Sequence, residues 1–417
     1  MKKVRKALML IIDGMGGRPL DEFGGLTTLE AAHTPCFDTL ALGGITGLMD
    51  PLSPGIRVGT DVGHLALFGY NPLKVYWGRG PIEAIGVGIE LKPGDVALRC
   101  NFATVDDKLV VVDRRAGRIR HTQALAAVLD KMSLDDGVTV TFKPATEHRA
   151  VLVLSGGRLS AEITNSDPGP ANEGAPLMEV TAKHPNQPVA EKTARLVNEF
   201  VRRSHEILSE HEENKERVRK GLHPANIVIT RGAGMAVKMR SLTERFDIKG
   251  CCITGESTVV GIAHMAGFSV LTNEKLTANI DTDLNEKARL TVKALQQADF
   301  VVTHVKGADL MAHDSRPREK LKFIERVDGM LQRIIDSYDT PQDVLIAVTA
   351  DHSTPCAIRE HSADPVPVLI HGEDVLVDDV KSFGERACAH GGLCRIRAND
   401  FLLSIFDLMG ATYRFGS

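Results

Sequence analysis

Several acidic and histidine side chains in this sequence follow closely after short apolar runs. Asp13 comes directly after the run at residues 6–12, and Asp351 and His352 come shortly after the run at residues 344–348. Such runs are typical of buried parallel strands, and ligands of open α/β sheets gather beyond the carboxyl ends of these strands. Because a carboxylate and an imidazole both offer lone pairs to a divalent cation, these positions predict a metal site.

Further candidate ligands lie elsewhere in the chain. Asp309 and His313 are four residues apart, after a predicted strand at residues 299–305, so within a helical turn they share one face and could hold one ion. His390, which precedes two glycines, is another candidate. Each of these residues alone is more often structural, as a cap or a packed histidine. Metal binding is favoured because the pattern recurs at separate strand ends.

Thr60 is the candidate nucleophile. It lies between Gly59 and Asp61, just before a short apolar segment that is expected to be helical. The first N–H groups of a helix attract anions, so a hydroxyl there can attack a phosphoryl group or simply cap the helix. For a lone threonine the cap is the commoner role, and His64, one turn later, is expected to be packed or capping.

Together these residues favour phosphoryl transfer. Two divalent ions about 3.5–4 Å apart form a clamp for in-line phosphoryl displacement. One ion can lower the pKa of a bound hydroxyl, which would make Thr60 a nucleophile near neutral pH, and the other can stabilise the phosphoryl oxygens. A mixed set of Asp and His ligands suits manganese or zinc better than magnesium, which prefers oxygen ligands.

The length of 417 residues exceeds what one hydrophobic core usually spans, so two domains are expected. The sequence pattern predicts an α/β fold, in which a parallel-sheet domain is split in sequence and a smaller α/β domain is inserted into it. The expected ranges are 1–78 and 277–417 for the sheet domain and 79–276 for the insertion. Expected helices span 27–42 and 189–220 and begin near 315; expected strands span 96–105, 109–112, 138–143, 150–154 and 366–370.

The inserted domain carries a second set of polar candidates. Arg231 lies in the segment Arg-Gly-Ala-Gly, and His148, Arg149 and Asp167 precede it in the sequence. Arginines beside glycines suit the recognition of phosphate or carboxylate groups. Each of these residues alone is more often a partner in a surface salt bridge, so the pattern by itself leaves their role open.

Composition argues against several other functions. The chain has 50 basic and 54 acidic residues, a net charge of -4, which gives no basic field for nucleic acid and no polybasic patch for a membrane surface. No apolar run reaches the roughly 18 residues of a membrane span. The seven cysteines form no CxxC pair, which argues against a disulfide framework and predicts a reducing, cytoplasmic setting. No feature indicates an oligomeric state.

A series of longer motifs extends over nearly the whole chain. They are IIDGMGG, GTDVGHLALFGYNP, GRGPIEAIGVGI, TNSDPG, RGAG, HVKGADLMAHD, ADHSTPC with HSADPVPVLI, and HGGLCRI. With these motifs the sequence resembles the archaeal-type cofactor-independent, or 2,3-bisphosphoglycerate-independent, phosphoglycerate mutases of the alkaline phosphatase superfamily. The pair ADHSTPC and HSADPVP is the most specific, whereas IDG and a single D-x-x-x-H are common.

The resemblance implies an alkaline-phosphatase-like sheet domain and an isomerase of glycolysis and gluconeogenesis. Such an enzyme interconverts 3-phosphoglycerate and 2-phosphoglycerate through a phosphoenzyme. The hydroxyl of Thr60 would take the phosphate, the glycerate would reorient while trapped between the domains, and the phosphate would return to the other oxygen. The implied cofactors are two divalent ions, with Mn²⁺ favoured over Zn²⁺, Co²⁺ or Mg²⁺.

The resemblance also assigns roles to the candidate residues. One ion would be held by Asp13, Thr60, Asp351 and His352. The other would be held by Asp309, His313 and His390. The carboxylate and hydroxyl of the glycerate would be held by His148, Arg149, Asp167 and Arg231.

Two residues depart from the family pattern. The family nucleophile is usually a serine, and the extra methyl group of Thr60 is expected to slow transfer. A lysine is expected just before the Gly-Ile-Ala of STVVGIAH, where this chain has Val260, and its loss would weaken or rearrange the grip on the substrate. Two alternatives therefore stay open: a metal-dependent phosphomonoesterase that uses the same site, and a non-catalytic protein that binds a phosphate ligand.

Overall fold

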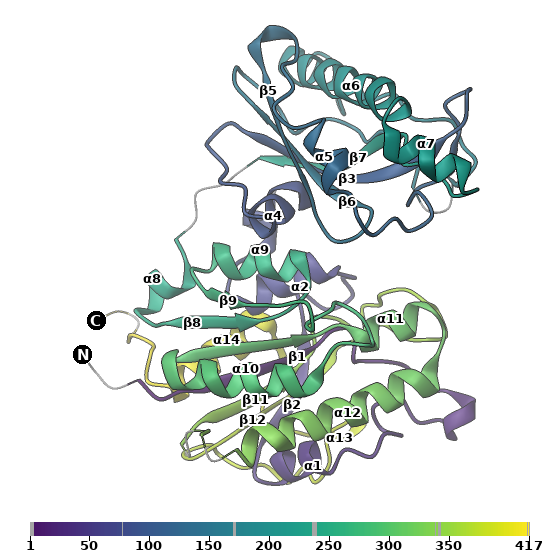
Figure 1. The fold of residues 1–417 in the computed structure, drawn as a ribbon. Coiled ribbons are helices and arrows are strands. Elements are labelled where there is room, and N and C mark those ends of the chain that lie inside the picture. The colour runs from purple at the N-terminus through teal and green to yellow at the C-terminus, as the bar shows by residue number, and fades with distance from the viewer. Residues whose placement is uncertain are drawn as a thin grey trace. The chain divides into compact units, whose positions relative to one another are not determined.

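The computed structural model of the chain describes residues 4–76, 78–169, 172–235, 240–337, 339–340, 343–414 and 416. The chain divides into two compact units (Figure 1). The first, here called the sheet unit, comprises residues 1–75 and 240–417, and the second, the inserted unit, comprises residues 76–239. Both units combine helices and strands, so the predicted α/β class with a smaller insertion is confirmed.

The sheet unit is built around an eight-stranded sheet of described residues. Its strands lie in the order β13 (Cys394–Arg397), β2 (Gly44–Asp50), β12 (Val366–His371), β11 (Leu345–Thr349), β1 (Ala7–Ile12), β10 (Phe300–Val305), β8 (Gly250–Ile253) and β9 (Ser269–Leu271). Strands β11, β1, β10, β8 and β9 run parallel, whereas β12 is antiparallel to β11 and β2. The predicted parallel sheet therefore holds for its centre and not for β12.

Helices cover both faces of this sheet. They are α1 (Pro35–Leu42), α2 (Thr60–Leu67), α3 (Pro72–Val75), α8 (Leu242–Phe246), α9 (Ser257–Met265), α10 (Leu284–Gln297), α11 (Gly307–His313), α12 (Pro317–Ile335), α13 (Glu385–Cys388) and α14 (Ala398–Leu408), with a 3-10 turn η1 (Asp21–Phe23). Helices α1, α10 and α12 pack together over one face, and α2, α9 and α14 pack together over the other (Figure 1). Strands β1, β10 and β11 are consequently buried along their whole length, which explains their continuous apolar sequences.

The register of the central strands sets where the candidate ligands emerge. Ile12 pairs with Val305, and Ile11 pairs with Thr349, so β1, β10 and β11 end at the same edge of the sheet. The N–H of Asp13 donates to the carbonyl of Val305 at 2.9 Å, which extends the pairing of β1 by one residue. The chain segments that follow these three strands therefore start next to one another.

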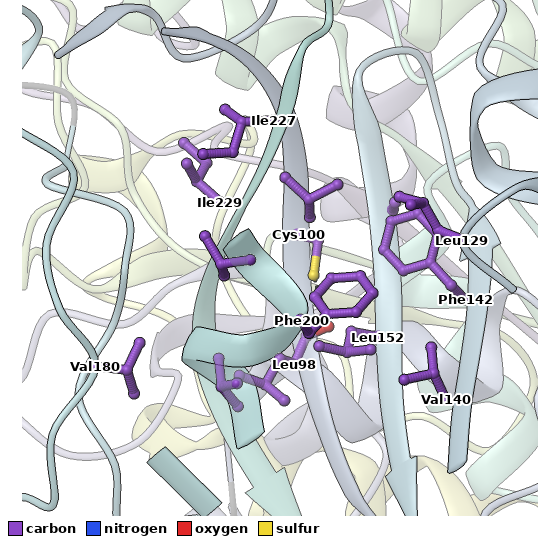
Figure 2. Packing of buried hydrophobic residues seen from close by; sticks show 14 of the residues in the cluster. Leu98, Cys100, Leu129, Val140, Phe142, Leu152, Val180, Phe200, Ile227 and Ile229 are labelled. Atoms are coloured by element: carbon purple, nitrogen blue, oxygen red, sulfur yellow. Dashed lines mark hydrogen bonds between the residues drawn. The ribbon is translucent and has the colours of Figure 1, made fainter. Parts of the chain in front are cut away.

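The inserted unit contains an antiparallel sheet. Its strands are β3 (Val96–Val105), β4 (Val111–Asp113), β5 (Thr139–Pro144), β6 (Arg149–Ser155) and β7 (Ile227–Met235), and its helices are α4 (Arg79–Gly86), α5 (Gln123–Ala127), α6 (Pro188–Ser209) and α7 (Glu212–Arg219), with a 3-10 turn η2 (Asp135–Gly137). The long strand β3 pairs with β6 on one side and β7 on the other, and β5 pairs with β6. The core between the sheet and α6 includes Phe142, whose ring centroid lies 5.4 Å from that of Phe200 (Figure 2).

The predicted second boundary of the insertion, at residue 276, is wrong. The inserted unit ends near residue 239, and β8, α9 and β9 belong to the sheet unit. Strand β8 pairs in parallel with β10, and β9 pairs in parallel with β8. The local sequence of a short apolar strand such as β8 does not show which sheet the strand joins, because its partner strand is determined by tertiary pairing.

Two predicted helices are also shorter than expected. The helix expected at residues 27–42 begins only at Pro35, because proline restricts the preceding Thr34 to non-helical angles and is itself favoured as a first helical residue. The helix expected at 189–220 is two helices, α6 and α7. The second starts after His211, whose side chain accepts a hydrogen bond from the N–H of Glu213.

Two composition arguments can be compared with the structure. All seven cysteines lie in described parts of the chain and are free. None of the helices that the structure describes has the length and apolar character that crossing a membrane requires.

Replacing Phe200 by alanine is expected to destabilise the inserted unit by about 3–5 kcal/mol, because a fully buried ring is lost and a cavity remains. Val218→Ala on α7 is the control, since that side chain is 59% exposed and its truncation should change stability by no more than about 0.5 kcal/mol. Urea unfolding followed by circular dichroism measures both. Equal effects would contradict the packing in Figure 2.

Candidate functional site

Ligand-type side chains from distant parts of the sequence lie together in the sheet unit. Two groups of three residues have nitrogen or oxygen atoms within 4.8 Å of one another. The first group is Asp13, Asp309 and His352, and the second is Asp309, His313 and His361. Asp309 belongs to both, so the two groups are adjacent. Either group could hold a metal ion.

The elements that position these residues follow from the sheet register. Asp13 follows β1, Asp309 and His313 lie on α11 just after β10, and Asp351 and His352 follow β11. The predicted helical turn between Asp309 and His313 is confirmed, and their side chains approach to 3.3 Å between Oδ1 and Nε2. Asp13, Asp309, Asp351 and His352 are buried.

Thr60 is the first residue of α2, and Gly59 is the N-cap. The hydroxyl of Thr60 is therefore not a cap, which was the commoner alternative for a lone threonine. Its Oγ1 lies 3.4 Å from Nε2 of His352 and 3.4 Å from Nζ of Lys306. Since the free N–H groups of the first helical turn also favour an anion, the hydroxyl lies where a phosphoryl group would be stabilised.

Buried carboxylate oxygens at this site lack hydrogen-bond partners. Oδ1 of Asp13 and Oδ2 of Asp351 accept no hydrogen bond from any residue that the structure describes. Nε2 of His352 approaches these two atoms at 3.4 and 3.2 Å. Burial lowers the pKa of His352, although both carboxylates oppose the shift, so the imidazole is neutral. Unsatisfied carboxylate oxygens beside a neutral imidazole fit a divalent cation.

His361 takes the place that was predicted for His390. Nδ1 of His361 lies 2.8 Å from the carbonyl of Val58, and its Nε2 lies 3.5 Å from Oδ1 of Asp309 and 3.2 Å from Nε2 of His313. The ring also stacks on that of His352, with centroids 3.7 Å apart. The segment HSADPVP, which begins with His361 and runs into β12, was the signal available in the sequence.

The prediction that His390 belongs to the second group is wrong. His390 is exposed and precedes the edge strand β13, which is three strand positions from β11. Strand β13 also runs parallel to β11, so His390, which precedes β13, lies towards the edge of the sheet where β11 starts, whereas Asp351 and His352 follow the other end of β11. The pair of glycines after His390 serves a different purpose, since the backbone at Gly391 packs directly on Thr46 of β2.

Lys306 is a site residue that the sequence pattern did not single out. Its Nζ lies 2.9 Å from Oδ2 of Asp13 and 3.1 Å from Oδ2 of Asp309. Burial disfavours the ammonium, but these two carboxylates outweigh it and raise the pKa of Lys306. Asp309 is likewise buried, yet Lys306 and the neighbouring histidines hold its pKa well below the usual value. Lys306 and Asp309 therefore both remain charged although they are buried.

Two further buried histidines contact the carboxylates of Asp351 and Asp13. Nδ1 of His64 lies 2.7 Å from the carbonyl of Thr60 and 3.2 Å from Oδ2 of Asp351. Nε2 of His304 lies 3.1 Å from Oδ2 of Asp13. The packed role expected for His64 is thus what the structure has, and it links the start of α2 to the end of β11.

Close backbone approach at two glycines brings these segments together. A Cβ atom at Gly14, where φ is +64°, would lie 2.7 Å from Oγ1 of Thr354 and 2.8 Å from Cβ of Asp309. A Cβ at Gly63 on α2 would lie 2.4 Å from the carbonyl of Asp351. Any larger residue would separate the ligands, which explains the glycines in both motifs.

The inserted unit holds a separate cluster of arginines. Asp167 accepts two hydrogen bonds from Arg114, at 2.7 and 2.5 Å, and lies 3.8 Å from Nε of Arg231. Arg231 pairs directly with Arg99 across β7 and β3. Asn101, two residues further along β3, pairs with Arg149. Two of the four predicted substrate residues, Arg149 and Arg231, therefore lie in one sheet.

This cluster has more positive charge than its own carboxylates balance. Arg99 is buried, and burial together with neighbouring arginines lowers its pKa to about 9, although Glu83 opposes the shift. Like charges directly opposite each other on paired strands are unfavourable. Buried atoms of Glu83, Asn101 and His148 accept or donate no hydrogen bond within the described chain. These features indicate a site for an anionic ligand.

Comparisons with known proteins agree with the motifs. The family model for 2,3-bisphosphoglycerate-independent phosphoglycerate mutase matches residues 41–214. The relative 2,3-bisphosphoglycerate-independent phosphoglycerate mutase 1 from Methanothermobacter thermautotrophicus is 44% identical to this chain over 416 residues. The match covers 99% of this chain and 100% of the relative. The one from Thermococcus kodakarensis is 43% identical over 421 residues, 100% of both. This chain belongs to the 2,3-bisphosphoglycerate-independent phosphoglycerate mutase family.

Solved structures of similar proteins share the fold. A protein from Pyrococcus horikoshii, 36% identical, superposes with a TM-score of 0.83 over 99% of this chain and 100% of that one. The cofactor-independent phosphoglycerate mutase from Thermoplasma acidophilum, 32% identical, gives 0.69 over 97% and 100%. The similarity to these proteins therefore holds for the fold as well as for the sequence.

Replacing His361 by glutamine is expected to weaken binding of Mn²⁺ about tenfold or more, because one ligand atom of the second group is lost. His390→Gln is the matched control and should bind Mn²⁺ as the wild type does. Titration calorimetry of metal-free protein with Mn²⁺ measures both. Weaker binding in the His390 variant alone would restore the prediction made from the sequence.

His148 is expected to make the stability of the inserted unit depend on pH. Burial, with help from Arg149, lowers its pKa to about 3 from an ordinary value of 6.5. Between these values the unfolded chain binds one more proton than the folded one, so stability falls as the pH falls from about 6.5 towards 3. His148→Gln removes this uptake, so urea unfolding at pH 7 and pH 4.5 should show a smaller loss in the variant. An identical loss would refute the assignment.

Proposed function

We propose that this protein interconverts 3-phosphoglycerate and 2-phosphoglycerate through a phosphoenzyme on Thr60. The observation that carries the proposal is the position of the Thr60 hydroxyl. It lies at the start of α2, 3.4 Å from both His352 and Lys306, and next to both ligand groups. Membership of the mutase family supplies the substrate class, a small phosphorylated glycerate.

The ligand groups would hold two divalent ions. We assign Asp13, Thr60, Asp351 and His352 to one ion, and Asp309, His313 and His361 to the other. Mixed oxygen and nitrogen donors favour Mn²⁺, with Zn²⁺, Co²⁺ or Mg²⁺ as alternatives. Such ions, when bound, lower the pKa of a hydroxyl and stabilise the charge on phosphoryl oxygens.

The side chains of the protein perform the rest of the transfer. In the first half, Oγ1 of Thr60 attacks phosphorus, the bond between phosphorus and the glycerate oxygen breaks, and that oxygen gains the proton which Thr60 loses. Lys306, kept charged by Asp13 and Asp309, stabilises the negative charge that develops on Oγ1. In the second half the other glycerate hydroxyl attacks the phosphothreonine, and Thr60 regains its proton.

The arginine cluster of the inserted unit would bind the glycerate. Arg99 and Arg231 face each other across the sheet, and their carboxylates, Glu83 at 3.3 Å and Asp167 at 3.8 Å, are shared with Arg79 and Arg114, so the carboxylate of the substrate would complete the charge balance. His148 and Arg149 remain candidates for contact with the hydroxyl. Asp167 has both oxygens hydrogen-bonded to Arg114, so we propose that it orients the arginines and does not itself contact the substrate.

The two departures from the family pattern fit this reading. Val260, on α9, offers no charge to the substrate, whereas Lys306 places an ammonium within 3.4 Å of the hydroxyl of Thr60. A threonine keeps the hydroxyl that transfer needs. The free cysteines are consistent with the cytoplasmic setting that we propose for the reaction.

Thr60→Ala is expected to lower kcat by about a thousandfold or more, because no oxygen remains to accept the phosphate. Thr60→Ser keeps the hydroxyl and should remain active. The assay follows conversion of 3-phosphoglycerate with Mn²⁺ by ³¹P NMR, without added bisphosphoglycerate, and mass spectrometry of quenched enzyme should find phosphate on Thr60. Free phosphate that accumulates faster than 2-phosphoglycerate would identify a phosphomonoesterase, and full activity of Thr60→Ala would exclude the phosphothreonine.

A further inference from the structure

Lys320 is a buried lysine behind the ligand groups. It lies on α12, its exposed fraction is 0%, and no carboxylate in the described chain forms an ion pair with it. Its Nζ donates hydrogen bonds to the carbonyl of Gly16 at 3.1 Å and to the carbonyl of Thr354 at 3.0 Å. The ammonium thus joins two backbone segments that are 338 residues apart in the sequence.

These two segments carry the ligands of the site. Gly16 lies three residues after Asp13, and Thr354 lies two residues after His352. The N–H of Thr354 also donates to the carbonyl of Gly16 at 3.0 Å, so the segments are in direct contact. Lys320 therefore holds together the chain that follows β1 and the chain that follows β11.

The side chain of Thr354 extends this link to the second ligand group. Its Oγ1 donates to Oδ1 of Asp309 at 2.9 Å and lies 3.0 Å from Nδ1 of His352. Oδ1 of Asp309 in turn lies near His313 and His361, at 3.3 and 3.5 Å. A single ammonium is thus connected, through one residue, to both groups of candidate ligands.

Burying an ammonium at this position is unfavourable in itself. A buried ammonium loses its hydration, and burial lowers the pKa of Lys320. Its two hydrogen bonds to backbone carbonyls offset this cost. The ammonium orients the carbonyls of Gly16 and Thr354. It thereby fixes the separation of the two segments that bear Asp13 and His352.

We propose that Lys320 is a positioning residue that sets the distance between the ligand-bearing segments after β1 and β11. The proposal rests on the metal site of the proposed function. It assigns a role to Lys320 in binding the ions, through Thr354 and the two backbone segments, without contact between Lys320 and an ion.

Lys287 provides a matched comparison. It is also buried, on α10, and its Nζ donates to one carbonyl, that of His304, at 3.0 Å. His304 lies within β10, whose backbone is already held by β1 and β8. Removing this lysine takes away a buried ammonium from the same unit, while strand pairing on both sides keeps the backbone of His304 in place.

The experiment compares Lys320→Met with Lys287→Met in the full chain. Mn²⁺ binding is measured by titration calorimetry and by the electron paramagnetic resonance signal of free Mn²⁺, and the Tm of the metal-free protein is measured in parallel. Lys320→Met should raise the Kd for Mn²⁺ about 10- to 100-fold, whereas its metal-free Tm should change no more than that of Lys287→Met, since each variant removes one buried ammonium. Lys287→Met should bind Mn²⁺ as the wild type does.

A second variant keeps the test decisive if Lys320→Met does not fold. Thr354→Val removes the hydroxyl that connects Lys320 to Asp309 and His352, and it should also weaken Mn²⁺ binding. In the double variant the two losses should be less than additive, because both act on one connection.

Three results would overturn the inference. They are wild-type Mn²⁺ affinity in Lys320→Met, equal weakening in Lys287→Met, and strictly additive losses in the double variant. Failure of the metal site on which the inference rests is distinguished from these results, because the wild-type protein itself would then bind no Mn²⁺, and failure of the mutase reaction alone is seen separately in the ³¹P NMR assay.

Discussion

The parallel register of β11, β1 and β10 brings three buried carboxylates to one edge of the sheet. Asp13 and Asp351 follow β1 and β11, and Asp309 lies in the first turn of the helix after β10. Buried carboxylates that close together repel one another, so they persist only where cations or donors balance them. In the structure this balance comes from Lys306 and from histidines, and in the working enzyme we propose that divalent ions complete it. The position of Thr60, the close glycines and the buried lysines all serve this one edge.

The inserted unit presents the opposite electrostatic problem. Its sheet places Arg99 opposite Arg231, and both carboxylate oxygens of Asp167 already accept hydrogen bonds from Arg114. An excess of guanidinium groups needs an anion, as an excess of carboxylates needs a cation. This excess is the physical reason why we propose that the inserted unit binds an anionic group of the substrate, and that phosphoryl transfer takes place at the carboxylates of the sheet unit.

Local sequence pattern predicted the buried strands well. The expected strand at 96–105 coincides with β3, and the strand ends with Asp13 and Asp351 were also placed correctly, because long apolar runs next to glycine and aspartate leave few alternatives. The pattern failed where tertiary contacts decide. It extended the insertion to residue 276, because β8 looks the same whichever sheet it joins. It ran a helix through Thr34 and another through Glu210, whereas α1 begins only at Pro35 and α7 begins only after its N-cap, His211.

The sequence by itself determined the kinds of residue at the site, the α/β class and the family, because these depend on motifs that are continuous in the chain. Tertiary structure decided which histidine completes the second ligand group. His361 and His390 each precede a strand of the same sheet, but β12 is antiparallel to β11 and β13 is parallel to it. Strand direction and order therefore bring His361 beside Asp309 and place His390 at the opposite edge of the sheet. It also decided the contacts of Lys306 and Lys320, since an isolated lysine in a helical segment has no signature of burial. Such contacts depend on which backbone lies next to the side chain, and strand pairing over hundreds of residues fixes that.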